Sequence, residues 1–179
     1  GLDIYFPTNN SIVSKSPLVL FIHDGGFLDG NKKSAKNDCQ VLASKGFTVA
    51  SIDYRLGWTK DNTNPCASNV GEALNAFYRA QQDARAALRF LVSKAATYSI
   101  DVTNVFIVGA SSGAQIAMAI PYLTQDSAEV YYPGISKNLG LLDDAGNNLK
   151  NTYSIKGIGC MWGSLINTSL ITQQNAVPS

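Results

Sequence analysis

The stretch VFIVGASSGAQIAMA, residues 105–119, decides the fold of this chain. Its four apolar residues at 105–108 predict a buried strand, and the alanine-rich residues 114–119 predict a helix. The Gly-x-Ser-x-Gly pentapeptide at 109–113 connects the strand and the helix, so the chain must turn tightly there, with Ser111 in the middle. Such a turn strains the backbone of the serine, and a Cβ on either flanking glycine would collide with it. Ser111 is therefore the candidate nucleophile, and an ordinary strand-to-helix turn of small residues is the alternative.

A second glycine turn lies upstream. Residues 17–22 predict a buried strand that runs directly into HDGG at 23–26. Acyl transfer builds negative charge on a carbonyl oxygen, and backbone N–H groups aimed at that oxygen stabilise the charge. Glycines let the backbone come close enough, so we expect the N–H groups of Gly25, Gly26 and Ser112 to form an oxyanion hole. A glycine turn that only ends a strand is the alternative.

These motifs, together with DYRLG at 53–57 and QDARAALRFL at 82–91, resemble the carboxylesterase branch of the α/β-hydrolase superfamily. Within that branch the chain resembles the secreted acetyl- or feruloyl-esterase-like proteins of bacteria, over nearly its whole length. The resemblance implies an acyl-enzyme at Ser111, no cofactor, and a supporting role for His23, which props the glycine loop in that family. The family usually has HGGG where this chain has HDGG, so Asp24 is expected to face away from the site.

Predicted strands and helices alternate along the chain. This order indicates an α/β fold, with a mainly parallel sheet covered by helices on both faces. Residues 131–152 lack a clear periodicity and are expected to form an irregular excursion. The chain, 1–179, is expected to be one partial domain, truncated at both ends of the fold. The further strands are expected at residues 2–6, 47–52 and 155–162, and the helices at 34–44 and 72–98.

The chain contains one histidine, His23, and it lies in the glycine loop. A serine hydroxyl is a poor nucleophile at neutral pH, and it needs a histidine to take its proton and an acid to orient that histidine. In this fold both partners follow the serine along the chain. The chain is therefore expected to be a fragment that lacks the triad acid and base and is nearly inactive alone. None of the acids after Ser111 ends an apolar strand: Asp126, Glu129, Asp143 and Asp144.

Composition narrows the classes of partner. The 179 residues, 45% of them hydrophobic, can form one domain with a sizeable core. The net charge of +1 and the scattered basic residues argue against nucleic acid, and the apolar runs are too short to span a bilayer. No spacing of cysteine and histidine resembles a metal site. The expected partner is an ester substrate, with neither nucleic acid nor membrane.

Cysteines and tryptophans bear on compartment and packing. A bridge between Cys39 and Cys66 is geometrically possible and would indicate an extracytoplasmic or secreted protein, whereas buried thiols in a cytoplasmic enzyme are the alternative. Cys160 and Trp162 belong to the last predicted strand and are expected in the core, and a pocket wall formed with Tyr131 and Tyr132 is the alternative for Trp162. Trp58 follows the DYRLG motif and is a candidate wall of the substrate pocket.

The charged residues of the DYRLG and QDARAALRFL motifs are expected to support the fold rather than react. Asp53 and Arg55 lie at the carboxyl end of a predicted strand, where they are expected to pair and brace the glycine loop. Asp83 and Arg85 lie on the long predicted helix and are expected to be solvated or structural charges.

The sequence thus predicts a serine carboxylic-ester hydrolase for small-acyl esters. The family resemblance adds acetyl or feruloyl esters of polysaccharide as candidate substrates. A serine peptidase of the prolyl-oligopeptidase type shares the fold and the serine turn. Outside the enzymes, the alternative is a non-catalytic hydrolase-fold module that binds a ligand.

Overall fold

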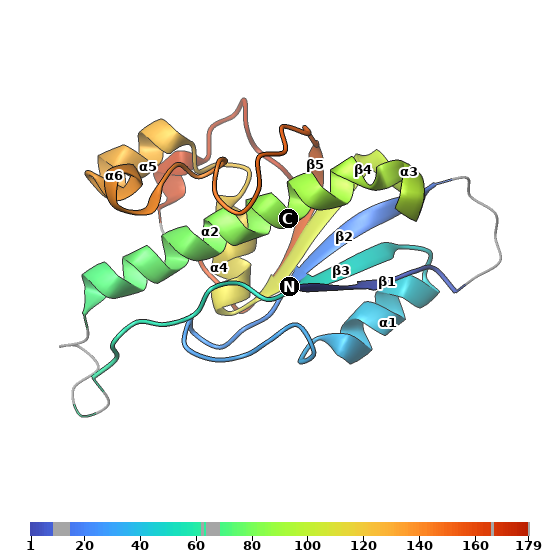
Figure 1. Ribbon diagram of the computed structural model, residues 1–179, viewed down its shortest axis with the longest axis horizontal. Helices are drawn as coiled ribbons and strands as arrows, with labels where there is room; N and C mark the ends of the chain where they lie inside the picture. The colour runs from blue at the N-terminus through green and yellow to red at the C-terminus, as the bar shows by residue number, and fades with distance from the viewer. Residues whose placement is uncertain (9–14, 62, 64–68, 166, 179) are drawn as a thin grey trace.

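The computed structural model describes residues 1–8, 15–61, 63, 69–165 and 167–178. Within these residues one sheet has the strand order β1-β3-β2-β4-β5 (Figure 1). Neighbouring strands from β3 to β5 pair in parallel, and β1 pairs with β3 in the antiparallel sense. The predicted, mainly parallel sheet is confirmed. Strands β1 to β5 are Leu2–Tyr5, Ser16–Ile22, Thr48–Ile52, Ile100–Ala110 and Ile155–Met161.

Helices cover both faces of this sheet (Figure 1). Because successive side chains of a strand point to opposite faces, the apolar run of β2 supplies two cores. Leu20 and Ile22 belong to the larger core, under α2 and α4, and Val19 and Phe21 to the smaller core, under α1. The helices α1 to α6 are Lys36–Ser44, Val70–Ser93, Ala95–Tyr98, Ser112–Ala119, Gln125–Tyr131 and Ile135–Leu139.

The long helix α2 begins two residues earlier than expected, because Asn69 caps it. The Asn69 side chain accepts a hydrogen bond from the N–H of Glu72 at 3.1 Å, which satisfies one of the free donors of the first turn. The expected helix 72–98 is broken at Lys94, whose ψ of 11° departs from helical values, and α3 follows as a separate turn. The helix is therefore two elements, and only α2 spans the sheet.

Residues 131–152, expected to be irregular, contain α6 and pack along α2. The Tyr78 hydroxyl donates to the carbonyl of Gly140 at 2.8 Å, and the Gln82 amide donates to the carbonyl of Leu139 at 2.9 Å. These partners lie about 60 residues apart in the sequence. Helical periodicity is weak in a helix as short as α6, so the sequence pattern could not distinguish it from a loop.

The expectation that Cys160 and Trp162 are in the core is wrong. Cys160 is exposed, and the side chain of Trp162 is 78% exposed. Strand β5 is the outermost strand of the described sheet, and its Ile158 N–H donates to the Pro178 carbonyl of the tail at 2.9 Å. An apolar strand at a sheet edge leaves part of its side chains uncovered.

Cys39 has a free thiol that is buried between α1 and the sheet. Burial raises the pKa of this thiol to about 12, so it is protonated at neutral pH. Its candidate bridge partner, Cys66, lies outside the described residues. Among the described helices, none is long and apolar enough to cross a membrane.

Candidate active site

Ser111 alone forms the turn between β4 and α4. Strand β4 ends at Ala110 and α4 begins at Ser112. Ser111 has φ 50° and ψ −117°, a conformation that residues with a side chain rarely adopt. Its N–H donates to the Met161 carbonyl at 2.9 Å, which ties the turn to β5. The serine is partly exposed, at the carboxyl end of the sheet where ligands of open α/β folds bind.

Both glycines of the pentapeptide are sterically required, as the sequence predicts. A Cβ on Gly109 would lie 2.2 Å from the Gly113 carbonyl oxygen, and a Cβ on Gly113 would lie 2.1 Å from the Ile22 carbonyl oxygen. Cβ atoms do not approach backbone oxygens this closely. The turn therefore brings α4 against the end of β2 at a distance that only glycine permits.

The glycine loop begins directly after β2 and meets the start of α4. Three successive residues have positive φ: 113° at Gly25, 61° at Gly26 and 63° at Phe27. The Gly26 N–H donates to the Ser112 Oγ at 3.0 Å. The structure thus brings the residues predicted for an oxyanion hole together. In the described part of the chain, the N–H groups of Gly25 and Ser112 have no hydrogen-bond partner.

His23 lies inside this loop. Its side chain is 2% exposed, and its ring stacks on Tyr54 with centroids 4.2 Å apart. Its Nδ1 lies 2.6 Å from the Asp24 carbonyl oxygen, which can only accept, so Nδ1 carries the proton. Nε2 is buried and has no partner among the described residues. His23 therefore packs and bonds within the loop and makes no hydrogen bond to Ser111.

Asp24 is exposed and lines a hollow of about 300 Å³ on the α1 side of the sheet. Asp38 of α1 and the exposed Trp162 line the same hollow. Gly26, by contrast, contacts Ser112 at the start of α4. The hollow is also lined by Ala110 and Met161, which adjoin Ser111.

Tyr54 is a site residue that sequence reasoning did not single out. Its hydroxyl lies 3.1 Å from the His23 carbonyl oxygen, 3.3 Å from the Asp24 carbonyl oxygen and 3.1 Å from the Ser112 Oγ. Burial raises the pKa of Tyr54 to about 12, so the hydroxyl keeps its proton and can donate. Its position at the end of β3, beside β2, was the only signal that could have found it.

The residues after Tyr54 hold the far side of the glycine loop. The Gly57 N–H donates to the Phe27 carbonyl at 2.7 Å, and the Trp58 indole N–H donates to the Gly26 carbonyl at 2.9 Å. We call residues 54–58 the brace. Trp58 is thus in contact with the loop itself, a role that the sequence did not indicate.

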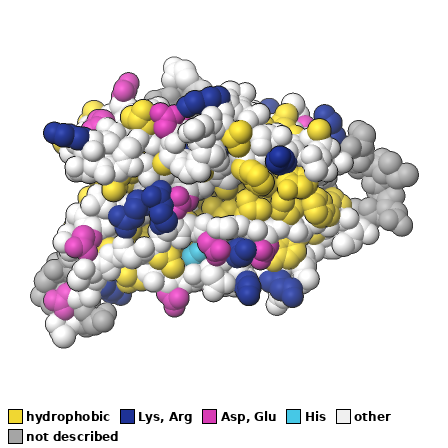
Figure 2. Space-filling model, in the orientation of Figure 1, with side chains coloured by type: hydrophobic (Ala, Val, Ile, Leu, Met, Phe, Trp, Pro, Cys, Tyr) yellow, Lys and Arg dark blue, Asp and Glu magenta, His cyan; other side chains and the backbone are white. Residues whose placement is uncertain are grey.

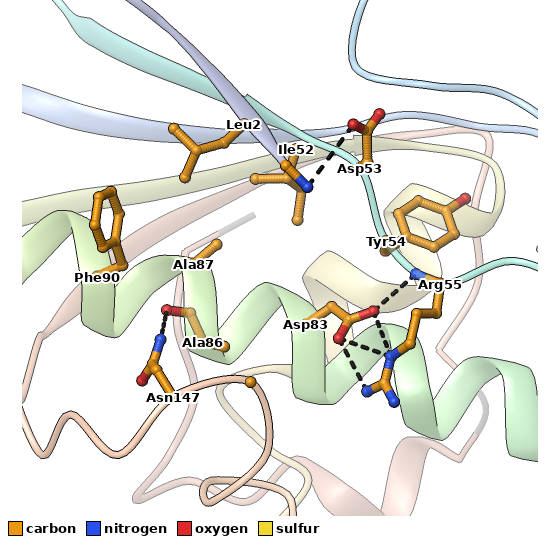
Figure 3. Close-up of a pocket in the computed structure, with 12 residues that line it drawn as sticks. Leu2, Ile52, Asp53, Tyr54, Arg55, Asp83, Ala86, Ala87, Phe90 and Asn147 are labelled. Carbon is orange, nitrogen blue, oxygen red and sulfur yellow. Dashed lines mark hydrogen bonds and ion pairs between the residues drawn. The ribbon is translucent and has the colours of Figure 1, made fainter.

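The predicted pairing of Asp53 with Arg55 is wrong, although Arg55 belongs to the brace and Asp53 directly precedes it. Asp53 accepts from the Lys32 N–H at 2.8 Å, whereas Arg55 pairs with Asp83 of α2 at 2.9 Å. Figure 3 shows the reason: the Asp53 carboxylate points away from α2, and the Arg55 guanidinium reaches across to that helix. The expectation that Asp83 is a structural charge is confirmed.

Arg85 is likewise structural, and it is buried. Its guanidinium donates to the Ile120 and Leu123 carbonyls at 2.9 and 2.6 Å, just after α4, and pairs with Asp143 at 3.3 Å. Carbonyls at a helix C-terminus lack partners within the helix and carry partial negative charge, so a cation is favoured there. Arg85 joins α2 to the end of the helix that starts at Ser112.

No acid after the turn is hydrogen-bonded to Ser111 within the described residues. Glu129 accepts from Ser136, and this hydrogen bond lowers the pKa of Glu129. Asp144 pairs with Lys150. Among the described residues there is also no group of three histidine, cysteine, aspartate or glutamate side chains that could hold a metal.

A larger hollow of about 630 Å³ opens between α2 and the strands β1 and β3 (Figure 3). Leu2, Ile52 and Phe90 line it, and hydrophobic side chains gather on this face of the molecule (Figure 2). Ser111 is not among its lining residues. The hollow is therefore distinct from the serine turn.

The chain is similar in sequence or in fold to proteins named as carboxylesterases or esterases. The BD-FAE family model matches residues 2–159. Carboxylesterase 1C of Mus musculus is 28% identical over 158 residues, covering 88% of this chain and 27% of that protein. Esterase B of Lactobacillus rhamnosis, solved with a tributyrin phosphonate inhibitor, has a TM-score of 0.63 at 22% identity, covering 89% of this chain and 42% of that one. Esterase 2 of Thermogutta terrifontis with propionate bound has a TM-score of 0.63 at 18% identity, covering 92% and 50%. The chain thus spans half or less of these three relatives.

Proposed function

Because the chain belongs to the BD-FAE family of α/β-hydrolases, we propose that it carries the nucleophile and the oxyanion hole of a serine carboxylic-ester hydrolase. The observation that carries this proposal is the backbone of Ser111. Ser111 is held in a strained conformation, with φ 50°, between β4 and α4 and beside the glycine loop. Such a nucleophile elbow exposes the serine hydroxyl to a substrate at the end of the sheet.

In the proposed reaction, the Ser111 oxygen attacks the ester carbonyl carbon while a base takes the hydroxyl proton. The alcohol leaves with that proton. Water then attacks the acyl carbon, the bond to the Ser111 oxygen breaks, the carboxylic acid is released, and the proton taken from water restores the Ser111 hydroxyl. His23 is a poor candidate for the base, because its Nδ1 proton is bonded to the Asp24 carbonyl and its ring is buried. We assign the base and its orienting acid to a part of the protein outside this chain.

The N–H groups of Gly25, Gly26 and Ser112 are proposed to bind the oxyanion of the tetrahedral intermediate. Ser112 is the first residue of α4, where free N–H groups and the helix dipole favour negative charge. The Gly26 N–H is bonded to the Ser112 Oγ. It would share its proton between the Ser112 Oγ and the oxyanion as charge develops.

The proposed substrates are esters of small acyl groups. The solved relatives named above are an esterase inhibited by a tributyrin phosphonate and an esterase with propionate bound, and both ligands are related to short-chain esters. Acetyl or feruloyl esters of polysaccharide are the more specific proposal, which rests on the family resemblance. Comparing kcat/KM for 4-nitrophenyl acetate, acetylated xylan and methyl ferulate in the full-length protein would rank these substrates.

The test of the proposed function is Ser111→Ala in the full-length protein. Hydrolysis of 4-nitrophenyl acetate is expected to fall by a factor on the order of 10⁴ or more, because the nucleophile is lost. Ser44→Ala, which removes an exposed hydroxyl on α1, is the matched control and should keep full activity. Incubation with paraoxon should add one diethylphosphoryl group to the peptide containing Ser111.

Other outcomes separate the alternatives. Cleavage of a prolyl peptide in preference to esters would favour a serine peptidase. Wild-type protein with neither turnover nor paraoxon labelling would favour a non-catalytic binding module, and it would contradict the esterase proposal.

A further inference from the structure

We propose that Trp58 is a positioning residue that keeps the oxyanion loop in its reactive conformation. This inference rests on the proposed function, because it assumes that the loop binds an oxyanion. The observation behind it is the hydrogen bond from the Trp58 indole N–H to the Gly26 carbonyl, 2.9 Å long. Trp58 makes this contact from the brace, 32 residues further along the chain.

Gly26 is the point where the loop most needs an external constraint. It has φ 61° between two further residues with positive φ, and glycine populates such conformations about as readily as their mirror images. The glycine backbone alone therefore does not select one direction for its N–H and C=O groups. Side chains from elsewhere in the fold have to select it.

Two side chains hold the two peptide planes that meet at Gly26. The Ser112 Oγ accepts from the Gly26 N–H at 3.0 Å, and the Trp58 indole donates to the Gly26 carbonyl. An indole N–H is only a donor, so Trp58 can bind the carbonyl and cannot bind an N–H presented by a flipped peptide. Trp58 thus fixes the peptide between Gly26 and Phe27, with its carbonyl turned toward the brace, while Ser112 holds the adjoining peptide that carries the Gly26 N–H.

The brace is itself anchored on α2, which makes it a firm support. The Arg79 guanidinium donates to the Gly57 carbonyl at 2.8 Å, and the Thr59 N–H donates to the Glu72 carboxylate at 2.6 Å. These contacts lie on both sides of Trp58 in the sequence. A displacement of the indole would therefore require moving the chain away from α2.

The first arm of the test needs no enzymatic activity. The chain has two tryptophans, and the side chain of Trp162 is 78% exposed. In full-length protein labelled with ¹⁵N-tryptophan, the Trp58 indole N–H is expected to exchange with solvent at least tenfold more slowly than that of Trp162. The variants Trp58→Phe and Trp162→Phe each remove one signal and so assign both. Equal exchange rates would show that the hydrogen bond is absent and would overturn the proposal.

The second arm measures turnover. Trp58→Phe keeps an aromatic ring but removes the donor, and we expect kcat to fall about tenfold while KM changes less than twofold. The rate of inactivation by paraoxon should fall in parallel, because it too builds charge on an oxygen in the hole. Trp58→His, which keeps a ring N–H, is expected to recover part of the loss.

Tyr78→Phe is the matched control. Tyr78 lies on α2, away from the loop, and its hydroxyl donates to the Gly140 carbonyl at 2.8 Å, so the variant also removes an aromatic donor to a backbone carbonyl. Tyr78→Phe should lower the melting temperature about as much as Trp58→Phe does, but it should leave kcat unchanged. Unchanged kcat in Trp58→Phe, or an equal loss of kcat in Tyr78→Phe, would overturn the positioning role. If wild type and Ser111→Ala have equal activity, the proposed function has failed, and slow indole exchange would then report only a structural contact.

Discussion

At the scale of single residues, the site depends on backbone conformations that few side chains tolerate. Ser111 has φ 50°, and its flanking glycines approach carbonyl oxygens more closely than any Cβ could. The strain at the serine is maintained by the packing of β4, α4 and β2 around it. The stability of variants at Gly109 and Gly113 therefore tests how closely the backbone approaches these carbonyl oxygens.

Gly113→Ala is expected to destabilise the protein strongly. The added methyl group would lie 2.1 Å from the Ile22 carbonyl oxygen, so either α4 or β2 must shift. We expect the free energy of unfolding, measured in urea, to fall by about 3 kcal/mol, as for an overpacked core. Gly71→Ala, at the start of α2 with no closer contact than 3.4 Å, should be neutral or slightly stabilising. Equal losses in the two variants would contradict the steric account.

Tyr54→Phe is expected to change the dependence of stability on pH. Burial raises the pKa of Tyr54 to about 12, whereas an unfolded tyrosine titrates near 10. Between these values the folded state binds more protons than the unfolded state, so the free energy of unfolding falls as pH rises, by up to about 1.4 kcal/mol per pH unit. At neutral pH this contribution to stability is fully present.

Removing the hydroxyl should make that decline shallower between pH 10 and 12. It should also cost about 1 kcal/mol at pH 7, because the His23 carbonyl and the Ser112 hydroxyl lose a partner. Urea titrations of wild type and variant across pH 7 to 12 measure both effects. An unchanged slope would mean that Tyr54 ionises normally in the folded protein.

At the scale of elements, segments far apart in the sequence hold the loop and the serine turn. The brace contacts the loop on one side and α2 on the other, and Arg85 of α2 binds the carbonyls that follow α4. Helix α2 thus supports both the glycine loop and the helix that begins at Ser112. The site is a property of these contacts between elements as much as of the motifs themselves.

Arg85→Leu is expected to destabilise the protein by about 3 kcal/mol, because it leaves the Ile120 and Leu123 carbonyls buried without a donor. The midpoint of urea unfolding measures the loss. Lys150→Leu removes an exposed cation that also pairs with an aspartate, and its midpoint should stay close to that of wild type. If both variants unfold at the wild-type midpoint, Arg85 does not stabilise the junction of α2 and α4.

At the scale of the whole molecule, β2 is the shared wall of two cores. Its residues alternate between the larger core under α2 and α4 and the smaller core under α1. The chain also continues directly from the end of β2 into the glycine loop. The same strand therefore contributes to stability on both faces and positions the loop at its end.

Leu20→Ala is expected to cost about 3 kcal/mol in the free energy of unfolding, because Leu20 is fully buried in the middle of β2. Val130→Ala, at a position that is 74% exposed on α5, should change it by less than about 0.5 kcal/mol. Thermal or urea unfolding of the two variants tests the assignment. A loss at Val130 as large as that at Leu20 would mean that α5 is packed against more of the protein than the structure describes.

The sequence by itself determined the strand-turn-helix around Ser111, the glycine loop after β2 and the mainly parallel sheet. These features follow from local sterics and from the period of apolar residues, which neighbouring residues along the chain already contain. Only the tertiary structure decided that Tyr54 and Trp58 hold the loop, that Arg55 pairs with Asp83, and that Trp162 is exposed. Each of these depends on residues more than 20 positions away, or on whether another element covers a strand edge, and no local pattern encodes either.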